Sequence, residues 1–223
     1  LQGGGVLSSG FLALDGGRKL LNEGIFNWTG GSLIYLGQNP TGTSVGGATI
    51  INALGATFND AVAGTINNGS GTNAFNNAGT FQTSFASGTT TIGVTFNNTG
   101  SVQVGTGGTL NLSGGGTSTG GSFTGGGTLQ FSSGYTFDAA STISTANAIF
   151  SAGTTTLAGT YSATNTTLSG GTLTTGSSPI TLGTNFTHAG GTLSGSGTVT
   201  VTGLASFTAA GNYMVETGSG TTE

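Results

Sequence analysis

The sequence predicts an all-β protein, a right-handed parallel β-helix (β-solenoid) of about 9–12 coils. Two pairs of similar segments lead to this prediction. Residues 75–81 (FNNAGTF) return as residues 96–102 (FNNTGSV), 21 positions later, and residues 107–112 return as residues 126–131, 19 positions later. Self-similarity at a period of about 20 residues is typical of a solenoid, in which each unit gains a core only by stacking on its neighbours.

The pattern within each unit is that of a short strand. In residues 102–104, 110–112 and 129–131, two apolar residues flank one polar residue. An alternation with period two places apolar side chains on one face of a strand and polar ones on the other. Glycines lie between these runs and predict turns, because glycine adopts positive φ without a steric penalty.

Residues 1–24 are the least repetitive part and are expected to form an N-terminal end coil or a junction segment. They hold Asp15, Arg18, Lys19 and Glu23, which are four of the eight charged side chains. Weak surface ion pairs are the favoured interpretation of this group, and a small ionic site is the alternative. A short helix over residues 18–23 is possible. The first residue is not Met, and we expect a processed form or a fragment.

Residues 25–223 are expected to form the solenoid repeats. Residues 26–36 have the pattern of a first full unit, a turn followed by an apolar strand, and Pro40 ends it because proline cannot donate to a strand ladder. Residues 48–59 have the pattern of strand, turn and strand. Near the C-terminal end, residues 171–173 (GTL) return as residues 191–193, 20 positions later.

The same alternation predicts which side chains form the core. The expected core residues are Leu33, Phe75, Phe96, Val102, Val104, Leu110, Leu112, Leu129, Phe131, Leu173, Leu193, Val199 and Val201. Asparagine tolerates left-handed backbone, and its amide can bond the copy above it in a stack. Asn76, Asn77, Asn97 and Asn98 are therefore expected to be corner or ladder residues, with a row of sugar contacts as the alternative.

Composition excludes several classes of partner. Only Arg18 and Lys19 are basic, whereas a nucleic-acid interface needs many cations to replace the counterions of phosphate, so we expect no nucleic-acid partner. No run of residues approaches the roughly 18 apolar residues of a membrane helix, so no transmembrane segment is expected. The chain has no cysteine, so it has neither disulfides nor thiolate metal sites.

The residues that could carry chemistry are scattered. Asp60, Asp138 and Glu216 are far apart in sequence, and His188 is the only histidine, for which we expect a surface or corner position. A catalytic pair or triad, or a metal site, needs such groups close together. The sequence therefore predicts no enzyme activity, no metal and no cofactor. Rows of threonine, as in residues 198–202, leave binding to ice or to a crystalline polysaccharide as a further alternative.

Residues 89–100 (TTTIGVTFNNTG), 110–117 (LNLSGGGT) and 190–203 closely resemble segments of very large secreted bacterial β-strand-repeat proteins. The likeness extends over most of the chain from about Asn22 onward, but its motifs carry no catalytic residues. More broadly, the chain is similar to autotransporter passenger regions and filamentous-haemagglutinin-type adhesins. The resemblance implies an extracellular or cell-surface bacterial β-helix that serves as a stalk, adhesin or matrix component.

We therefore expect an extracellular structural rod. The sequence contains no pattern of an amphipathic capping helix, so the end coils are expected to stack on other copies, head to tail in a filament, or on adjacent repeats of a longer chain. Surface glycans are further possible partners. The alternative function is a carbohydrate-binding or polysaccharide-processing β-helix, and a phage tail-fibre shaft is also conceivable.

Overall fold

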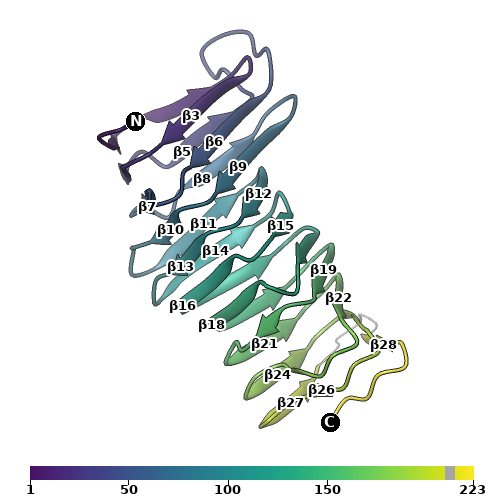
Figure 1. The fold of residues 1–223 in the computed structure, drawn as a ribbon. Helices are drawn as coiled ribbons and strands as arrows, with labels where there is room; N and C mark the ends of the chain where they lie inside the picture. The colour runs from purple at the N-terminus through teal and green to yellow at the C-terminus, as the bar shows by residue number, and fades with distance from the viewer. Residues whose placement is uncertain (209–213) are drawn as a thin grey trace.

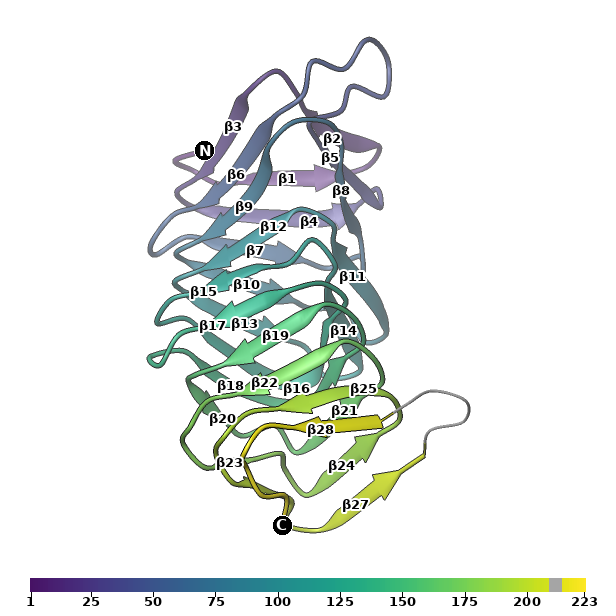
Figure 2. The ribbon, with the colours of Figure 1, turned by 90° about the vertical axis from the view of Figure 1, so that its right-hand side faces the viewer.

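The protein is a parallel β-helix of about 10 turns, and its strands lie on three faces (Figure 1). The computed structural model describes residues 1–208 and 214–223, and this part of the chain contains no helix. In Figure 2, the strands at the back run from left to right and those at the front run from right to left while the chain descends. The coil is therefore right-handed. The predicted fold class is confirmed.

Each turn contributes one strand, or half of a long strand, to each face. Face 1 consists of β1 (Gly5–Ser8), β4 (Ile25–Gly30), β7 (Thr57–Asp60), β10 (Thr80–Thr83), β13 (Ser101–Val104), the first halves of β16 (Ser122–Phe131) and β18 (Thr142–Phe150), β20 (Thr160–Tyr161), β23 (Ile180–Thr181) and β26 (Val199–Thr200). Face 2 consists of β2 (Phe11–Leu14), β5 (Leu33–Leu36), β8 (Thr65–Asn68), β11 (Gly88–Ile92), β14 (Gly108–Leu112), the second halves of β16 and β18, β21 (Asn165–Leu168), β24 (Asn185–His188) and β27 (Leu204–Phe207). Face 3 consists of β3 (Arg18–Asn22), β6 (Ala48–Asn52), β9 (Asn73–Asn77), β12 (Thr95–Asn98), β15 (Gly116–Ser118), β17 (Tyr135–Phe137), β19 (Thr154–Leu157), β22 (Thr172–Thr175), β25 (Gly191–Ser194) and β28 (Met214–Thr217).

Inward side chains from successive turns form columns along the axis. One column on face 2 takes a residue from each of ten paired strands or half-strands: Leu12, Ile34, Ile66, Ile92, Leu112, Phe131, Phe150, Leu168, His188 and Phe207. Burying one aliphatic or phenyl side chain stabilises the fold by about 1.5–3 kcal/mol. The turns are therefore held together chiefly by apolar contacts between like positions.

Most of the expected core residues occupy such columns. The buried core contains Phe75, Phe96, Val102, Val104, Leu110, Leu112, Leu129, Phe131, Leu173, Leu193 and Val199, and Val201 is partly buried against it. Leu33 requires a correction, because it points outward while Ile34 and Leu36 fill the inward positions. All three of these residues are apolar, so alternation did not indicate which side faces the core.

The helix considered for residues 18–23 is wrong. Residues Arg18–Asn22 form β3, which pairs in parallel with β6 over its whole length. Leu20 is partly buried against the core and Asn22 is fully buried, while the intervening Leu21 is exposed. An alternating burial pattern fits a strand, and pairing with the second turn decides the conformation.

Buried asparagines form a ladder at the corner that follows face 3. The side-chain amide of Asn22 donates to Asn52 Oδ1 (2.8 Å), that of Asn52 to Asn77 Oδ1 (2.7 Å), and that of Asn77 to Asn98 Oδ1 (2.8 Å). The second N–H of Asn77 bonds the Ser101 carbonyl (3.1 Å). Each amide thus joins two turns and satisfies a backbone carbonyl at the corner.

A second, shorter ladder lies outside, where Asn97 Nδ2 donates to Asn76 Oδ1 (2.9 Å). Asn76 and Asn97 are only partly buried, so water can replace this bond. The four asparagines singled out in the sequence therefore divide into an inner pair and an outer pair.

We predict that Asn77→Ala lowers the free energy of unfolding by about 3 kcal/mol, because it removes the buried hydrogen bonds of Asn77 to Asn52 and Asn98 and leaves one N–H of Asn52 without a partner. Urea unfolding followed by circular dichroism measures the change. Asn76→Ala is the matched control and is expected to cost less than about 1 kcal/mol. Equal losses in the two variants would contradict a special role for the inner ladder.

Candidate functional site

The carboxylates noted in the sequence lie on different turns. Asp60 belongs to the turn of β7, Asp138 follows β17, and Glu216 lies on β28. Three turns separate the first two and four separate the last two, so at about 4.8 Å per turn they are at least about 14 and 19 Å apart along the axis. Paired carboxylates that cleave glycosides lie within about 9.5 Å of each other. The fold does not bring these three groups into one site.

Asp60 is fully buried, at the end of β7. Its carboxylate accepts hydrogen bonds from the Thr90 hydroxyl (2.6 Å) and from the backbone N–H groups of Val62 (2.9 Å) and Gly64 (3.3 Å). The chain reaches this arrangement through Ala63, whose φ of 54° is in the left-handed region. Burial raises the pKa of Asp60, and the hydrogen bond from Thr90 partly opposes that rise. Sequence reasoning missed this site, because nothing marked Thr90, 30 residues away, as a partner.

Two partly buried aspartates near the surface organise loops. Asp15 accepts hydrogen bonds from the backbone N–H groups of Val45 (2.8 Å) and Gly46, and the bond from Val45 is the main reason that the pKa of Asp15 is lowered. Asp138 accepts from the N–H of Gly120 (3.0 Å), which lowers its pKa in the same way. The carboxylate of Asp15 thus binds backbone amides of the loop before β6, where the sequence suggested an ionic partner.

His188 is buried and not at the surface, which corrects the expectation from the sequence. It occupies an inward position between Leu168 and Phe207, and its ring centroid lies 5.7 Å from that of Phe186. Nε2 lies 3.4 Å from the Gly191 carbonyl oxygen, and Nδ1 has no partner in the described part of the chain. The histidine replaces an apolar residue in the column, so its position in the register, not its polarity, decided its burial.

No family model, curated protein or solved structure matches this chain. The repeats stack as a parallel β-solenoid, which is consistent with a β-repeat protein. Within residues 1–208 and 214–223, no helix has the length and apolar character needed to cross a bilayer. In the same residues, no three side chains of His, Asp or Glu gather into a metal-binding group.

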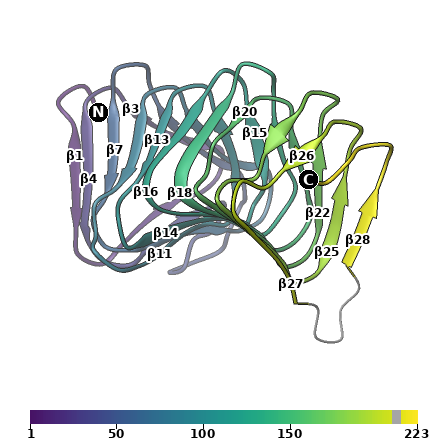
Figure 3. The same ribbon diagram turned by 90° about the horizontal axis from the view of Figure 1, so that it is seen from below.

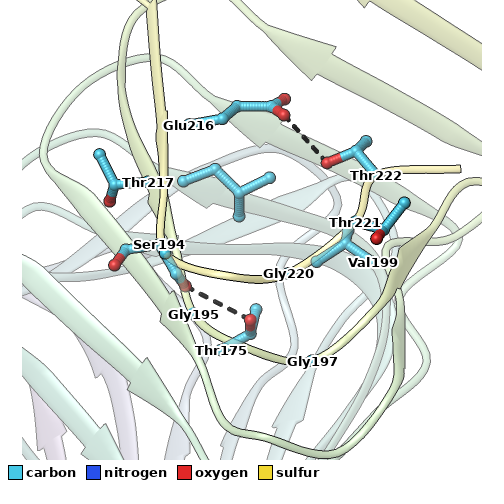
Figure 4. A pocket seen from close by; sticks show the side chains of 12 residues that line it. Thr175, Ser194, Gly195, Gly197, Val199, Glu216, Thr217, Gly220, Thr221 and Thr222 are labelled. Carbon is cyan, nitrogen blue, oxygen red and sulfur yellow. Dashed lines mark hydrogen bonds between the residues drawn. The ribbon is translucent and has the colours of Figure 1, made fainter.

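A cavity of about 260 Å³ lies between the last two turns (Figure 4). Its walls include Thr175, Ser194 and Glu216, and Glu216 accepts a hydrogen bond from the Thr222 hydroxyl (3.0 Å). Glu216 lies in register with the buried Leu193 but is itself exposed. The last turn therefore presents a carboxylate at the position that Leu193 holds in the turn before it.

The outer surface carries ordered columns of threonine. On face 3, Thr117, Thr136, Thr156 and Thr174 lie in register on successive strands. Of the Thr198–Thr202 run, only Thr200 lies in a strand, where it pairs with Thr181. Binding to ice or to a crystalline polysaccharide stays a prediction. The threonines that could serve it lie on stacked strands of successive turns and are not neighbours along the sequence.

We predict that Asp60 makes stability fall as pH rises above about 4. The pKa of its carboxyl is raised in the folded state above its ordinary value of 3.8, so folding has no ionisation cost below that value, and the cost appears as pH rises through the folded pKa. The slope is at most about 1.4 kcal/mol per pH unit. Urea unfolding between pH 3.5 and 7 measures it as the difference between the natural protein and Asp60→Asn.

Asp15 and Asp138 shift stability with the opposite sign, because their pKa values are lowered in the folded protein. Both aspartates are present in the natural protein and in Asp60→Asn. The difference in unfolding free energy between these two proteins therefore does not contain their contribution. A difference that stays constant over this pH range would contradict the assignment of a raised pKa to Asp60.

We predict that His188→Leu raises the free energy of unfolding by about 1–2 kcal/mol, because it removes a buried nitrogen without a partner and continues the apolar column. Thermal and urea unfolding measure the change. The control is Thr187→Leu, the outward neighbour, which is expected to stay within about 0.5 kcal/mol of the natural protein. A loss of stability in His188→Leu would show that the imidazole makes a contact worth more than its burial costs.

Proposed function

We propose that this protein is a structural rod on the outside of a bacterial cell, acting as an adhesin, stalk or matrix component. The observation that carries the proposal is the column on face 2, which passes through ten strands in register and makes the chain one continuous stack. The resemblance to secreted β-strand-repeat proteins supports the extracellular location. Solubility comes from threonine, serine and asparagine, since only 4% of the residues are charged.

The two end turns support joining of rods head to tail. In the described part of the chain, β2 and β27 each have one edge without a strand beside it. β1 of the first turn and β27 of the last lie at opposite ends of the stack (Figure 3). Phe207 belongs to an inward column yet is 51% exposed, because no further turn covers it in the described part of the chain. Placing β27 of one copy on β2 of the next would cover Phe207 and pair both edges.

Charge does not set the polarity of assembly. The first turn holds Arg18 and Lys19 on β3, but Asp15 and Glu23 lie beside them in sequence and balance their charge. Head-to-tail joining is favoured by the free strand edges and by Phe207. Adjacent repeats of a longer chain would be joined by the same contacts.

We expect the isolated chain to form rods and then filaments as its concentration rises. Sedimentation velocity and negative-stain electron microscopy measure the assembly. Phe207→Asp is expected to prevent it, because a charge would be buried at the junction. Thr156→Asp, an outward substitution in the middle of the rod, is the matched control and should assemble normally. A discrete monomer without fibres at the highest attainable concentration would overturn head-to-tail joining and leave the single rod.

A further inference from the structure

Face 1 is interrupted near its C-terminal end, whereas the strands of faces 2 and 3 form unbroken series. β20 pairs only with β18, and β23 pairs only with β26 in a separate two-stranded sheet. Outside the strands, backbone hydrogen bonds join the two sides only at the ends of the gap, from Gly176 N–H to the Leu157 carbonyl (3.2 Å) and from Thr184 N–H to the Thr164 carbonyl (2.8 Å). Between these two points, the backbone N–H and C=O groups that face the gap lack the interstrand hydrogen bonds found elsewhere on face 1.

The break has a cause in the sequence. On this face, outward residues donate their N–H to the preceding turn, as Ser162 does to the Ile143 carbonyl (2.8 Å). Ile180 points inward, and its N–H donates to the following turn, at the Thr198 carbonyl (2.9 Å). Pro179 therefore holds the outward position that faces β20, and proline has no N–H to donate. Pro179 thus removes one donor from the ladder that would join β20 and β23.

Open depressions mark the gap at the surface. Three adjoining ones of about 170, 360 and 390 Å³ lie along it, lined chiefly by residues 157–164 on one side and residues 176–184 on the other. We name this feature the face 1 groove. Its lining includes Tyr161, whose side chain is 7% exposed and bonds Thr166 in the interior, and the partly buried Ile180. The two strands that border it, β20 and β23, are labelled in Figure 2.

The walls combine hydrogen-bonding groups with apolar surface and contain no charged residue. The hydroxyls of Thr160, Ser162 and Thr181 accompany the unpaired backbone groups. A charged ligand would find no counter-charge there, and an apolar one would leave donors and acceptors unpaired. Sugar hydroxyls both donate and accept, as a groove lined by hydroxyls and backbone polar groups requires. We propose that the face 1 groove binds an uncharged glycan chain.

An extended peptide fits the groove less well. A strand inserted between two others needs them about 9.6 Å apart, twice the usual spacing. Cα atoms of β20 and β23 lie within 8 Å of each other, so the gap is too narrow for an added strand. A glycan can lie over the groove from outside and send single hydroxyl groups into it. This activity is separate from the proposed rod function and does not depend on filament formation.

Isothermal titration calorimetry of the whole chain with cellohexaose, laminarihexaose and maltohexaose tests the proposal, with hexagalacturonate as the charged comparison. At least one neutral oligosaccharide is expected to bind, and the charged one is expected to bind at least tenfold more weakly. Thr181→Phe, which fills the groove, is expected to weaken binding at least tenfold. Ser144→Phe is the matched control, because both residues are exposed and point outward from face 1.

A third variant tests the cause of the break. Pro179→Ala restores the missing N–H, and the gap is expected to close, with a higher melting temperature and weaker glycan binding. Circular dichroism establishes that each variant keeps the fold. The proposal is overturned if none of the three neutral oligosaccharides binds, if Thr181→Phe binds as well as Ser144→Phe, or if an uncharged extended peptide binds at the groove and no oligosaccharide does.

Discussion

Each turn of this protein depends on its neighbours for a core. A single turn of about 20 residues has inward side chains on three short strands and too few of them to fill its own interior. Stacking places like over like at the strand spacing, so apolar columns and backbone ladders form together. Stability is therefore shared between adjacent turns, and a defect in one turn acts first on the turns beside it.

The interior handles polar groups in three ways. The inner asparagine ladder satisfies its amides by repetition, because each side chain is both donor and acceptor to the next turn. The carboxylate of Asp60 accepts hydrogen bonds from Thr90 of the next turn and from two nearby backbone amides. His188 is satisfied only weakly, and it lies one turn from the end of its column. Repetition gives the most complete pairing, since identical groups meet at the spacing that a hydrogen bond requires.

The outer surface can be understood from the same stacking. With few charges, its properties come from hydroxyl and amide groups arranged in register, and departures from that order stand out. The last turn departs from it because Phe207 is exposed where a further turn would cover it. The face 1 groove departs from it because Pro179 removes one donor. Both proposals of partners rest on these departures, the first on an apolar end with a free strand edge and the second on unpaired backbone groups.

The repeat of about 20 residues and the alternation within it determined the fold class, and they placed Leu110 and Leu129 in adjacent positions of one column. Pairing partners elsewhere required the tertiary structure. Stacked asparagines of the inner ladder are 30, 25 and then 21 residues apart, because the loops between strands differ in length. A change of one residue in a loop moves a side chain from the inside to the outside. The outward position of Leu33, the burial of His188, the contact of Thr90 with Asp60 and the gap at Pro179 are all consequences of register, which is a property of the packed turns and not of any single repeat.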